Sequence, residues 1–245
     1  MAHYNLGFIS DNDIFEHVKN TVLKYRTFMD LKYFNQNVID PIKLTFDAKV
    51  YGKTFEEIIE AECIRQIDKA NTNHIGYFHQ NLFTYAGHGW EVPTAGFDVV
   101  NNERHIFCEL KNKHNTMNDA SSQKTYMKMQ AKLLSDDRAV CMLVETIAKK
   151  SGNEPWRARV DGNSFCHERI RRVSMDKFYG IVFGDETAFS RLCKALPDIL
   201  DDVVKELHCG RIENHVYDEL KQISPETLKS LYLLAFSKYE GFDNF

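Results

Sequence analysis

Apolar side chains recur along this chain at two different spacings, and each spacing predicts its own kind of element. In residues 10–25 and 54–70 they recur every three or four positions, which is the period of a helix with one buried face. Thr54 and Glu57 have the spacing of a capping box, so we expect the second helix to begin there. The polar run at residues 71–73 predicts a break after this helix.

Further helices are expected in the later parts of the chain, at residues 74–83, 119–134, 187–207 and from Ser224 onward. Asn118 or Asp119 can cap the helix that ends at Leu134. Pro197 suggests a break in the helix over residues 187–207. At the last helix, we expect Ser224 as the N-cap and Pro225 in the first helical position.

Continuous apolar runs predict buried strands at residues 97–100, 106–110, 139–147 and 178–183. We expect the run at 139–147, AVCMLVETI, in the centre of a sheet. Residues 149–172 contain Gly and Pro, which suggests loops or a short hairpin. The order of elements predicts an α/β fold, with a central mixed β-sheet flanked by α-helices.

Charged residues interrupt two of these apolar strands. Asn101-Asn102 is turn chemistry, so residues 97–110 predict a hairpin that brings Asp98 beside Glu109 and Lys111. Two carboxylates that share one site repel each other unless a cation lies between them, and their oxygens suit Mg²⁺. A lysine beside the metal can orient a water molecule. The alternative is a solvated strand face, on which Glu and Lys two residues apart are common.

The chain carries a net charge of −4, but that charge is unevenly distributed. Residues 111–172 contain 13 Lys or Arg and 7 Asp or Glu, a net +6, which leaves −10 for the remainder. Lys124, Lys128 and Lys132 recur every four residues and form one basic stripe on their helix. A basic region beside a candidate metal site suits a polyanionic substrate, although such a stripe is also typical of a solvated helix face.

The basic region ends in residues 149–172, a segment that is rich in arginine. Arginine binds phosphate and the guanine edge with two parallel hydrogen bonds, so we expect this segment to contact DNA, with a merely solvated surface as the alternative. The candidate DNA-binding residues are Lys113, Asn115, Lys124, Lys128, Arg157, Arg159, Arg169, Arg171 and Arg172.

Length and composition limit the remaining possibilities. The chain has 245 residues, which we expect to form a single domain with a helical part at 1–85, a catalytic core at 86–207 and a C-terminal helical part at 208–245. No stretch approaches the ~18 apolar residues of a membrane span. The cysteines stand singly with no CxxC pair, which predicts reduced thiols and a cytoplasmic protein. Walker, GxGxxG, HExxH and GxSxG motifs are absent.

The acidic hairpin and its flanking phrases resemble the PD-(D/E)XK nuclease superfamily. More closely, the chain resembles the type II restriction endonucleases that cut GGNCC-type sites. The phrases that carry the resemblance are DPIKLTFDAKVY at 40–51, RQIDKANTNHIGYFHQ at 65–80 and ELKNKHNTMNDASSQKTYMKMQ at 109–130. The resemblance implies a restriction-endonuclease-like fold.

The resemblance also implies roles for the residues of the hairpin. Asp98 and Glu109 hold Mg²⁺, the carbonyl of Leu110 is a possible further ligand, and Lys111 positions the attacking water. Phe97 stands where the family has a proline before the first acid, and Gln80 stands where related nucleases often place a glutamate. Gln80 is a poorer metal ligand than a carboxylate, but it can orient water.

The function that the resemblance implies is Mg²⁺-dependent hydrolysis of double-stranded DNA at a short palindromic site, with 5′-phosphate products. A palindromic site implies a homodimer, and protection of the host genome implies a cognate DNA methyltransferase. The alternatives are a DNA repair or structure-specific nuclease of the same fold, and a non-catalytic DNA-binding protein on that scaffold.

Overall fold

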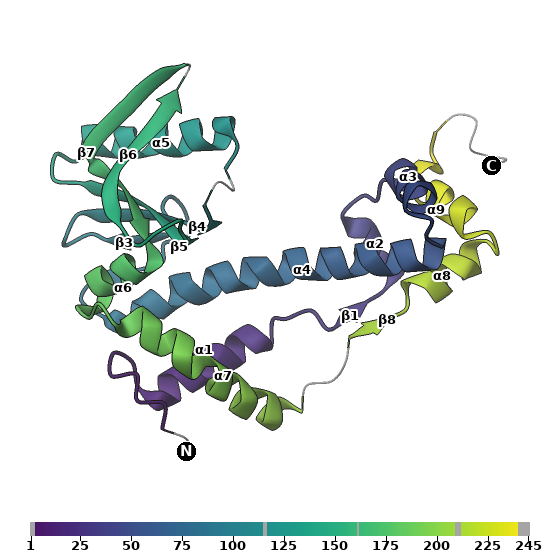
Figure 1. Cartoon of the computed structure of the whole chain (residues 1–245), viewed down its shortest axis with the longest axis horizontal. Coiled ribbons are helices and arrows are strands. Elements are labelled where there is room, and N and C mark those ends of the chain that lie inside the picture. Colours follow the sequence, from purple (N-terminus) through teal and green to yellow (C-terminus); the bar gives the residue numbers. More distant parts are fainter. Residues whose placement is uncertain (1–2, 115–116, 161, 209–211, 240–245) are drawn as a thin grey trace. The chain divides into compact units, whose positions relative to one another are not determined.

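The computed structural model describes residues 3–114, 117–160, 162–208 and 212–239. The chain divides into two compact units (Figure 1). The first contains Met1–Leu23 and Ile75–Leu207, and the second contains Lys24–His74 and His208–Phe245. One helix, α4 (Phe55–Leu82), contributes residues to both units. Within the described part of the chain, no helix is both long enough and apolar enough to cross a membrane.

A six-stranded mixed sheet forms the centre of the first unit, with the strand order β2-β3-β4-β5-β7-β6. Its strands are β2 (Trp90–Glu91), β3 (Val99–Asn101), β4 (Ile106–Lys113), β5 (Val140–Ile147), β6 (Asn153–Val160) and β7 (Asn163–Ser174). The pairs β4–β5 and β5–β7 are parallel, whereas β2–β3, β3–β4 and β6–β7 are antiparallel. The predicted central position of the strand at 139–147 is confirmed.

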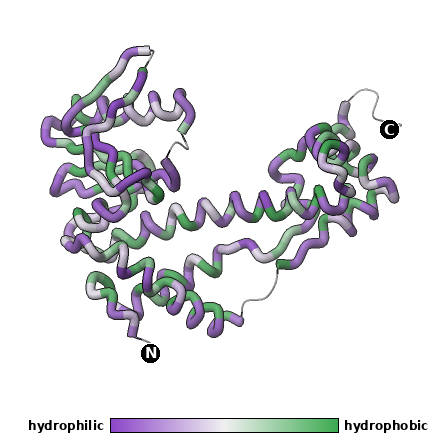
Figure 2. The backbone as a smooth tube through the Cα atoms, in the orientation of Figure 1, coloured by the Kyte–Doolittle hydropathy of each residue, from purple (hydrophilic) through white to green (hydrophobic). Residues whose placement is uncertain are grey.

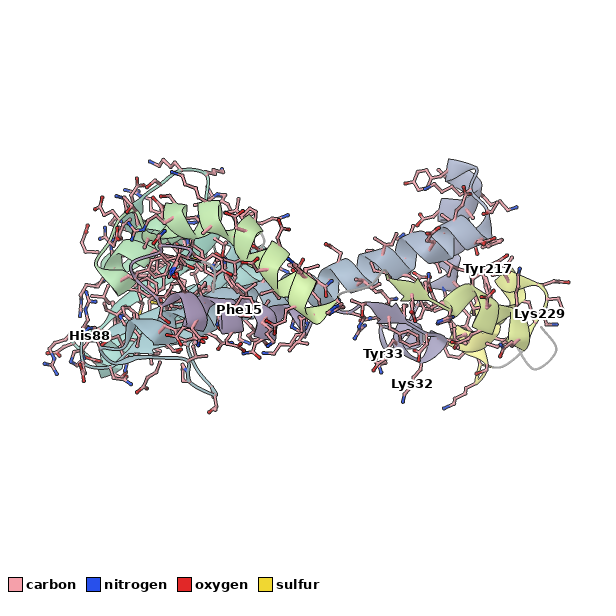
Figure 3. The ribbon with its side chains drawn as sticks, turned by 90° about the horizontal axis from the view of Figure 1, so that it is seen from below. Phe15, Lys32, Tyr33, His88, Tyr217 and Lys229 are labelled. Carbon is pink, nitrogen blue, oxygen red and sulfur yellow. The ribbon has the colours of Figure 1, made fainter. Side chains whose placement is uncertain are left out.

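Helices cover both faces of this sheet, as the sequence predicted. They are α1 (Asp11–Val22), the end of α4, the 3-10 helix η1 (Phe83–Ala86), α5 (Asp119–Ser135), α6 (Met175–Phe183) and α7 (Ala188–Leu207). Side chains of β4 alternate between two cores: Cys108 packs with residues of α1, α4, α6 and α7, whereas Phe107 packs with Tyr126 and Met129 of α5. Phe15 of α1, labelled in Figure 3, packs against the first of these cores.

Residues 178–183 form part of helix α6, so the predicted strand at this position is wrong. A short apolar run is equally consistent with a buried strand and a buried helix. Phe178, Tyr179 and Val182 are all buried, and their spacing places them on one side of a helix. Phe178 lies edge-to-face with Phe83 and Trp90, so this side packs into the aromatic core of the unit.

The sequence predicted helix breaks at residues 71–73 and at Pro197, but a helix continues through each of these positions. α4 continues through residues 71–73, where the side chain of Asn71 accepts a hydrogen bond from the backbone of Arg26 instead of capping a helix. α7 continues through Pro197, because the buried residues Ile199 and Val203 extend its apolar face beyond the proline. Figure 2 shows hydrophobic and hydrophilic positions interspersed along the whole of α4.

Two further boundaries differ from the prediction. The segment 149–172 forms a hairpin, as one of the two predicted alternatives, but β6 and β7 make it longer than the short hairpin expected, because Trp156, Ala158 and Ile170 are buried against α5 and β5. The last helix, α9 (Thr227–Phe236), begins three residues after Ser224. The Ser224 hydroxyl accepts a hydrogen bond from the backbone of Glu226, before the helix begins.

The second unit is mostly helical. Its elements are β1 (Phe28–Met29), α2 (Leu31–Gln36), α3 (Pro41–Tyr51), the first part of α4, β8 (Glu213–Asn214), α8 (Val216–Ile223) and α9. The strands β1 and β8 are parallel, and α2 and α8, which carry the labelled Tyr33 and Tyr217, pack on one core (Figure 3). The predicted capping box at the start of α4 is confirmed. The backbone of Thr54 donates to the Glu57 carboxylate at 2.8 Å, and the backbone of Glu57 donates to the Thr54 hydroxyl at 3.2 Å.

A buried histidine makes the stability of the first unit depend on pH. His79 of α4 is 8% exposed and lies 3.1 Å from the Tyr179 hydroxyl. Burial, together with the nearby His17, lowers the pKa of His79 to about 4. In the unfolded chain its pKa is about 6.5, so between pH 6.5 and pH 4 only the unfolded chain takes up the proton. Stability is therefore lost as the pH falls through this window.

We expect the free energy of unfolding to fall by about 2 kcal/mol more in the wild type than in a His79→Gln variant when the pH is lowered from 7 to 5. Urea titrations of both proteins at the two pH values measure the difference. An equal fall in the free energy of unfolding of the two proteins would contradict the lowered pKa of His79.

Candidate active site

The hairpin of β3 and β4 brings Asp98, Glu109 and Lys111 to one face of the sheet. The backbone N–H of Asp98 donates to the carbonyl of Cys108 at 2.9 Å, so the antiparallel pairing extends to Asp98. Because side chains alternate along a strand, Asp98 shares a face with Val100, and Glu109 and Lys111 share a face with Phe107. Val100 and Phe107 both belong to the core beneath α5, so the three polar side chains lie on the α5 side.

Asp98 is fixed by the neighbouring strand. Its Oδ2 accepts a hydrogen bond from the backbone N–H of Leu110 at 2.7 Å. This contact holds the carboxylate against β4 directly beside Glu109. Its other oxygen, Oδ1, makes no protein hydrogen bond within the described residues, so it can accept from a water molecule or bind a cation.

Glu109 is a buried carboxylate, 8% exposed, and its partner is Lys128 of α5. The Lys128 ammonium forms an ion pair with Glu109 Oε1, donates to the carbonyl of Gly96 at 2.6 Å and lies 4.4 Å from the centre of the Phe97 ring. A buried charge is costly unless it is paired, and this ion pair satisfies one oxygen of Glu109. Lys128, predicted as a DNA contact, is thus held at the acidic hairpin, and Phe97 contributes an aromatic face to that position.

Lys111 lies opposite Glu145 in the parallel pairing of β4 with β5. Glu145 is 3% exposed and accepts hydrogen bonds from Arg172 Nε and His114 Nδ1, each at 2.8 Å. The polar face of the hairpin therefore continues across β5 onto β7. Sequence reasoning missed Glu145 and His114. The available signal was that Glu145 interrupts the apolar run of β5 as Glu109 interrupts that of β4.

A groove of about 370 Å³ adjoins this buried cluster. Its basic lining residues are His114, Lys149, Lys150, Arg157 and Arg172, and its acidic ones are Glu145 and Glu154. Both acidic side chains are already paired within the protein, Glu145 with His114 and Arg172, and Glu154 with Lys150. The groove therefore presents mainly positive charge to a ligand.

Gln80 lies on α4 and is half-buried. Its neighbours Phe78 and Leu82 pack in the core on the opposite face of the sheet from Asp98. Among the contacts of the described residues, none joins Gln80 to Asp98, Glu109 or Lys111. The water-orienting role that the resemblance implied for Gln80 stays a prediction.

The remaining candidates for DNA contact lie in three places. Lys113 is exposed at the end of β4, and Lys124 is exposed in the first half of α5. The arginines are on the β6–β7 hairpin: Arg157, Arg159, Arg169, Arg171 and Arg172. Asn115 lies outside the described residues.

The chain matches the model of the Eco47II restriction endonuclease family over residues 6–205. It belongs to this family and is a type II restriction endonuclease. The predicted resemblance, fold class and enzyme class are therefore confirmed.

Two relatives are similar along most of their length. The chain is 33% identical to the type II restriction enzyme Sau96I of Staphylococcus aureus over 217 residues, which cover 84% of this chain and 83% of the relative. It is 30% identical to the type II restriction enzyme Eco47II of Escherichia coli over 215 residues, or 82% of this chain and 89% of the relative. No solved structure matches the chain.

Proposed function

We propose that this enzyme hydrolyses double-stranded DNA at a short palindromic site of the GGNCC type and leaves 5′-phosphates. The observation that carries the proposal is the convergence of Asp98, Glu109 and Lys111 on the hairpin of β3 and β4, beneath α5. Family membership supports the reaction class, and the basic groove beside the hairpin supports a polyanionic substrate.

Membership of the restriction endonucleases implies a divalent metal cofactor in general, and we propose that the metal here is Mg²⁺. The donor set fits this ion: Asp98 and Glu109 offer hard carboxylate oxygens on adjacent strands, and the Leu110 carbonyl is a further candidate ligand. Among the described residues, no three His, Cys, Asp or Glu side chains gather as a metal cluster, so water and substrate oxygens would complete the coordination. Bound Mg²⁺ supplies positive charge that stabilises the pentacovalent phosphate and activates water.

The protein's own residues orient the reacting groups. Asp98 is held by the Leu110 N–H, so its carboxylate direction is set before the substrate arrives. Lys111 is two residues beyond Glu109 on the same strand face, where its ammonium can donate to the attacking water or the reacting phosphate. The buried Glu145 lies opposite Lys111 in the pairing of β4 with β5.

We propose that both units belong to one endonuclease domain and that the enzyme acts as a homodimer. A palindromic site presents each strand in the same surroundings, so two copies related by twofold symmetry provide one active site per strand. A cognate DNA methyltransferase is the expected functional partner, because unmodified sites in the host genome are substrates.

Digestion of unmodified phage DNA with Mg²⁺ tests the proposal, with sequencing of the cut ends. We expect discrete fragments whose ends share one palindromic sequence with 5′-phosphates. Random ends, or cutting confined to branched junctions, favour a repair or structure-specific nuclease. Binding of duplex DNA with no cleavage in any divalent metal would favour a non-catalytic DNA-binding protein.

A further inference from the structure

The β6–β7 hairpin is a two-stranded ribbon with one apolar face. Ala158 pairs directly with Phe165, and the ring of Trp156 lies 5.3 Å from that of Tyr126 on α5. The Phe165 ring also lies beside Tyr126, at 6.5 Å. Directly opposed residues share a face of an antiparallel pair, so this face of the ribbon is turned toward α5 (Figure 1).

The opposite face of the ribbon carries polar side chains. Arg157 pairs with Cys166 and Arg159 pairs with Ser164, and all four residues are exposed. Within the described part of the chain, neither guanidinium makes a hydrogen bond or an ion pair to the protein. Their donors are therefore available to a ligand.

The other arginines of the hairpin are committed to the protein. Arg169 donates to the backbone carbonyls of Asp137 and Ala139. Arg171 donates to the side chain and backbone of Asn153 and to the carbonyl of Glu168. Arg172 donates through two nitrogens to the buried Glu145. These contacts hold all three guanidinium groups against the protein, Arg171 and Arg172 through two or more nitrogens each and Arg169 through Nη1. Of the five predicted arginines, Arg157 and Arg159 are therefore the two best placed to bind a base.

We infer that Arg157 and Arg159 are the residues that read the DNA sequence, each through a guanine in the major groove. The inference rests on the proposed double-stranded DNA substrate. The major groove admits a two-stranded β-ribbon, and an arginine fork donates to O6 and N7 of guanine together. Two residues along a strand span roughly 6.6 Å, so the two long side chains can reach neighbouring base pairs. A GGNCC half-site offers two adjacent guanines, one for each arginine.

Arg→Lys variants test the inference because they retain the charge and remove the fork. The single variants Arg157→Lys and Arg159→Lys are compared with Arg138→Lys, an exposed arginine before β5 that lies outside the ribbon. Affinity is measured with Ca²⁺ in place of Mg²⁺, for a GGNCC duplex and for a scrambled duplex of the same base composition. Thermal melting checks that each variant is folded.

We expect each ribbon variant to lower the affinity ratio of the two duplexes by roughly ten- to a hundredfold, with affinity for the scrambled duplex retained. Arg138→Lys should keep the wild-type ratio. Wild-type ratios in both ribbon variants would overturn the assignment. If the wild type binds the two duplexes equally with Ca²⁺ and cuts neither with Mg²⁺, the proposed site specificity fails, and the ribbon assignment fails with it.

The exposed thiol on the ribbon allows a second, independent measurement. Cys166 lies directly opposite Arg157, whereas Cys193 is exposed on α7 on the other side of the sheet. Partial burial of its thiol raises the pKa of Cys193, so each cysteine is compared with its own alkylation rate in the absence of DNA. We expect the GGNCC duplex to slow alkylation of Cys166 and to leave Cys193 unchanged, as read by peptide mass spectrometry. Equal rates at Cys166 with and without the bound duplex would overturn the inference.

Discussion

Replacement of Asp98 by asparagine is expected to lower the rate of DNA cleavage by roughly a thousandfold or more. The charge stabilisation that a bound divalent metal supplies is worth several kcal/mol, and each 1.36 kcal/mol corresponds to about a tenfold change in rate. An amide is neutral, so it replaces one of the two negative ligands with a weak one. Single-turnover cleavage of a duplex that the wild type cuts measures the loss.

The fold should survive this substitution. The Asp98 carboxylate accepts from the Leu110 N–H, and the oxygen of an amide can accept the same hydrogen bond. We therefore expect a thermal midpoint close to that of the wild type and weaker Mg²⁺ binding in calorimetry. Asp201→Asn, on the exposed side of α7, removes the same charge far from the hairpin and should leave both cleavage and metal binding unchanged. Wild-type cleavage by Asp98→Asn would remove Asp98 from the site.

The part of the candidate site that lies within one hairpin could be predicted from the sequence. Asp98 and Glu109 are close along the chain, and an antiparallel hairpin with a short turn leaves few possible registers. Helix starts were equally local: Ser10 caps α1, Thr54 and Glu57 form the capping box of α4, and Asn118 caps α5. Each of these signals is complete within a few residues.

The contacts that surround the hairpin were not predictable in this way. Lys128 reaches Glu109, and Arg172 and His114 reach Glu145, only after α5, β5 and β7 have packed in their observed register. Parallel strands are connected by long crossovers, and no local pattern specifies which residues of two such strands are neighbours. The cluster around Glu145 could be recognised only once the fold was known.

The lysine stripe of α5 shows how packing changes the meaning of a charge pattern. The sequence left two alternatives, a solvated helix face and a basic face for phosphates, but the ammonium of Lys132 lies 4.0 Å from the centre of the Phe107 ring and pairs with Asp136. Lys128 lies over Phe97 and pairs with Glu109. Long lysine stems often cover apolar surface while the charged end finds a partner. Of the three lysines, Lys124 alone is exposed and retains the predicted orientation toward solvent.

Replacement of Lys111 by methionine is the second change from which we expect a large effect, a rate loss of roughly a hundred- to ten-thousandfold, the range of general acid–base contributions. Methionine retains the length of the side chain and removes the donor. Lys111 is not a proposed metal ligand, so this variant should bind Mg²⁺ with nearly wild-type affinity, unlike Asp98→Asn. Calorimetry together with single-turnover cleavage separates the two roles.

The matched control is Lys194→Met on the exposed surface of α7, which removes one positive charge from the same unit. If loss of charge alone slowed cleavage, by weakening DNA binding, both variants would lose activity in low salt, and both would regain it at saturating enzyme. A defect in Lys111→Met that persists at saturation assigns the lysine to the chemical step. Full recovery at saturation would instead make Lys111 a DNA contact, and the attacking water would need another residue to orient it.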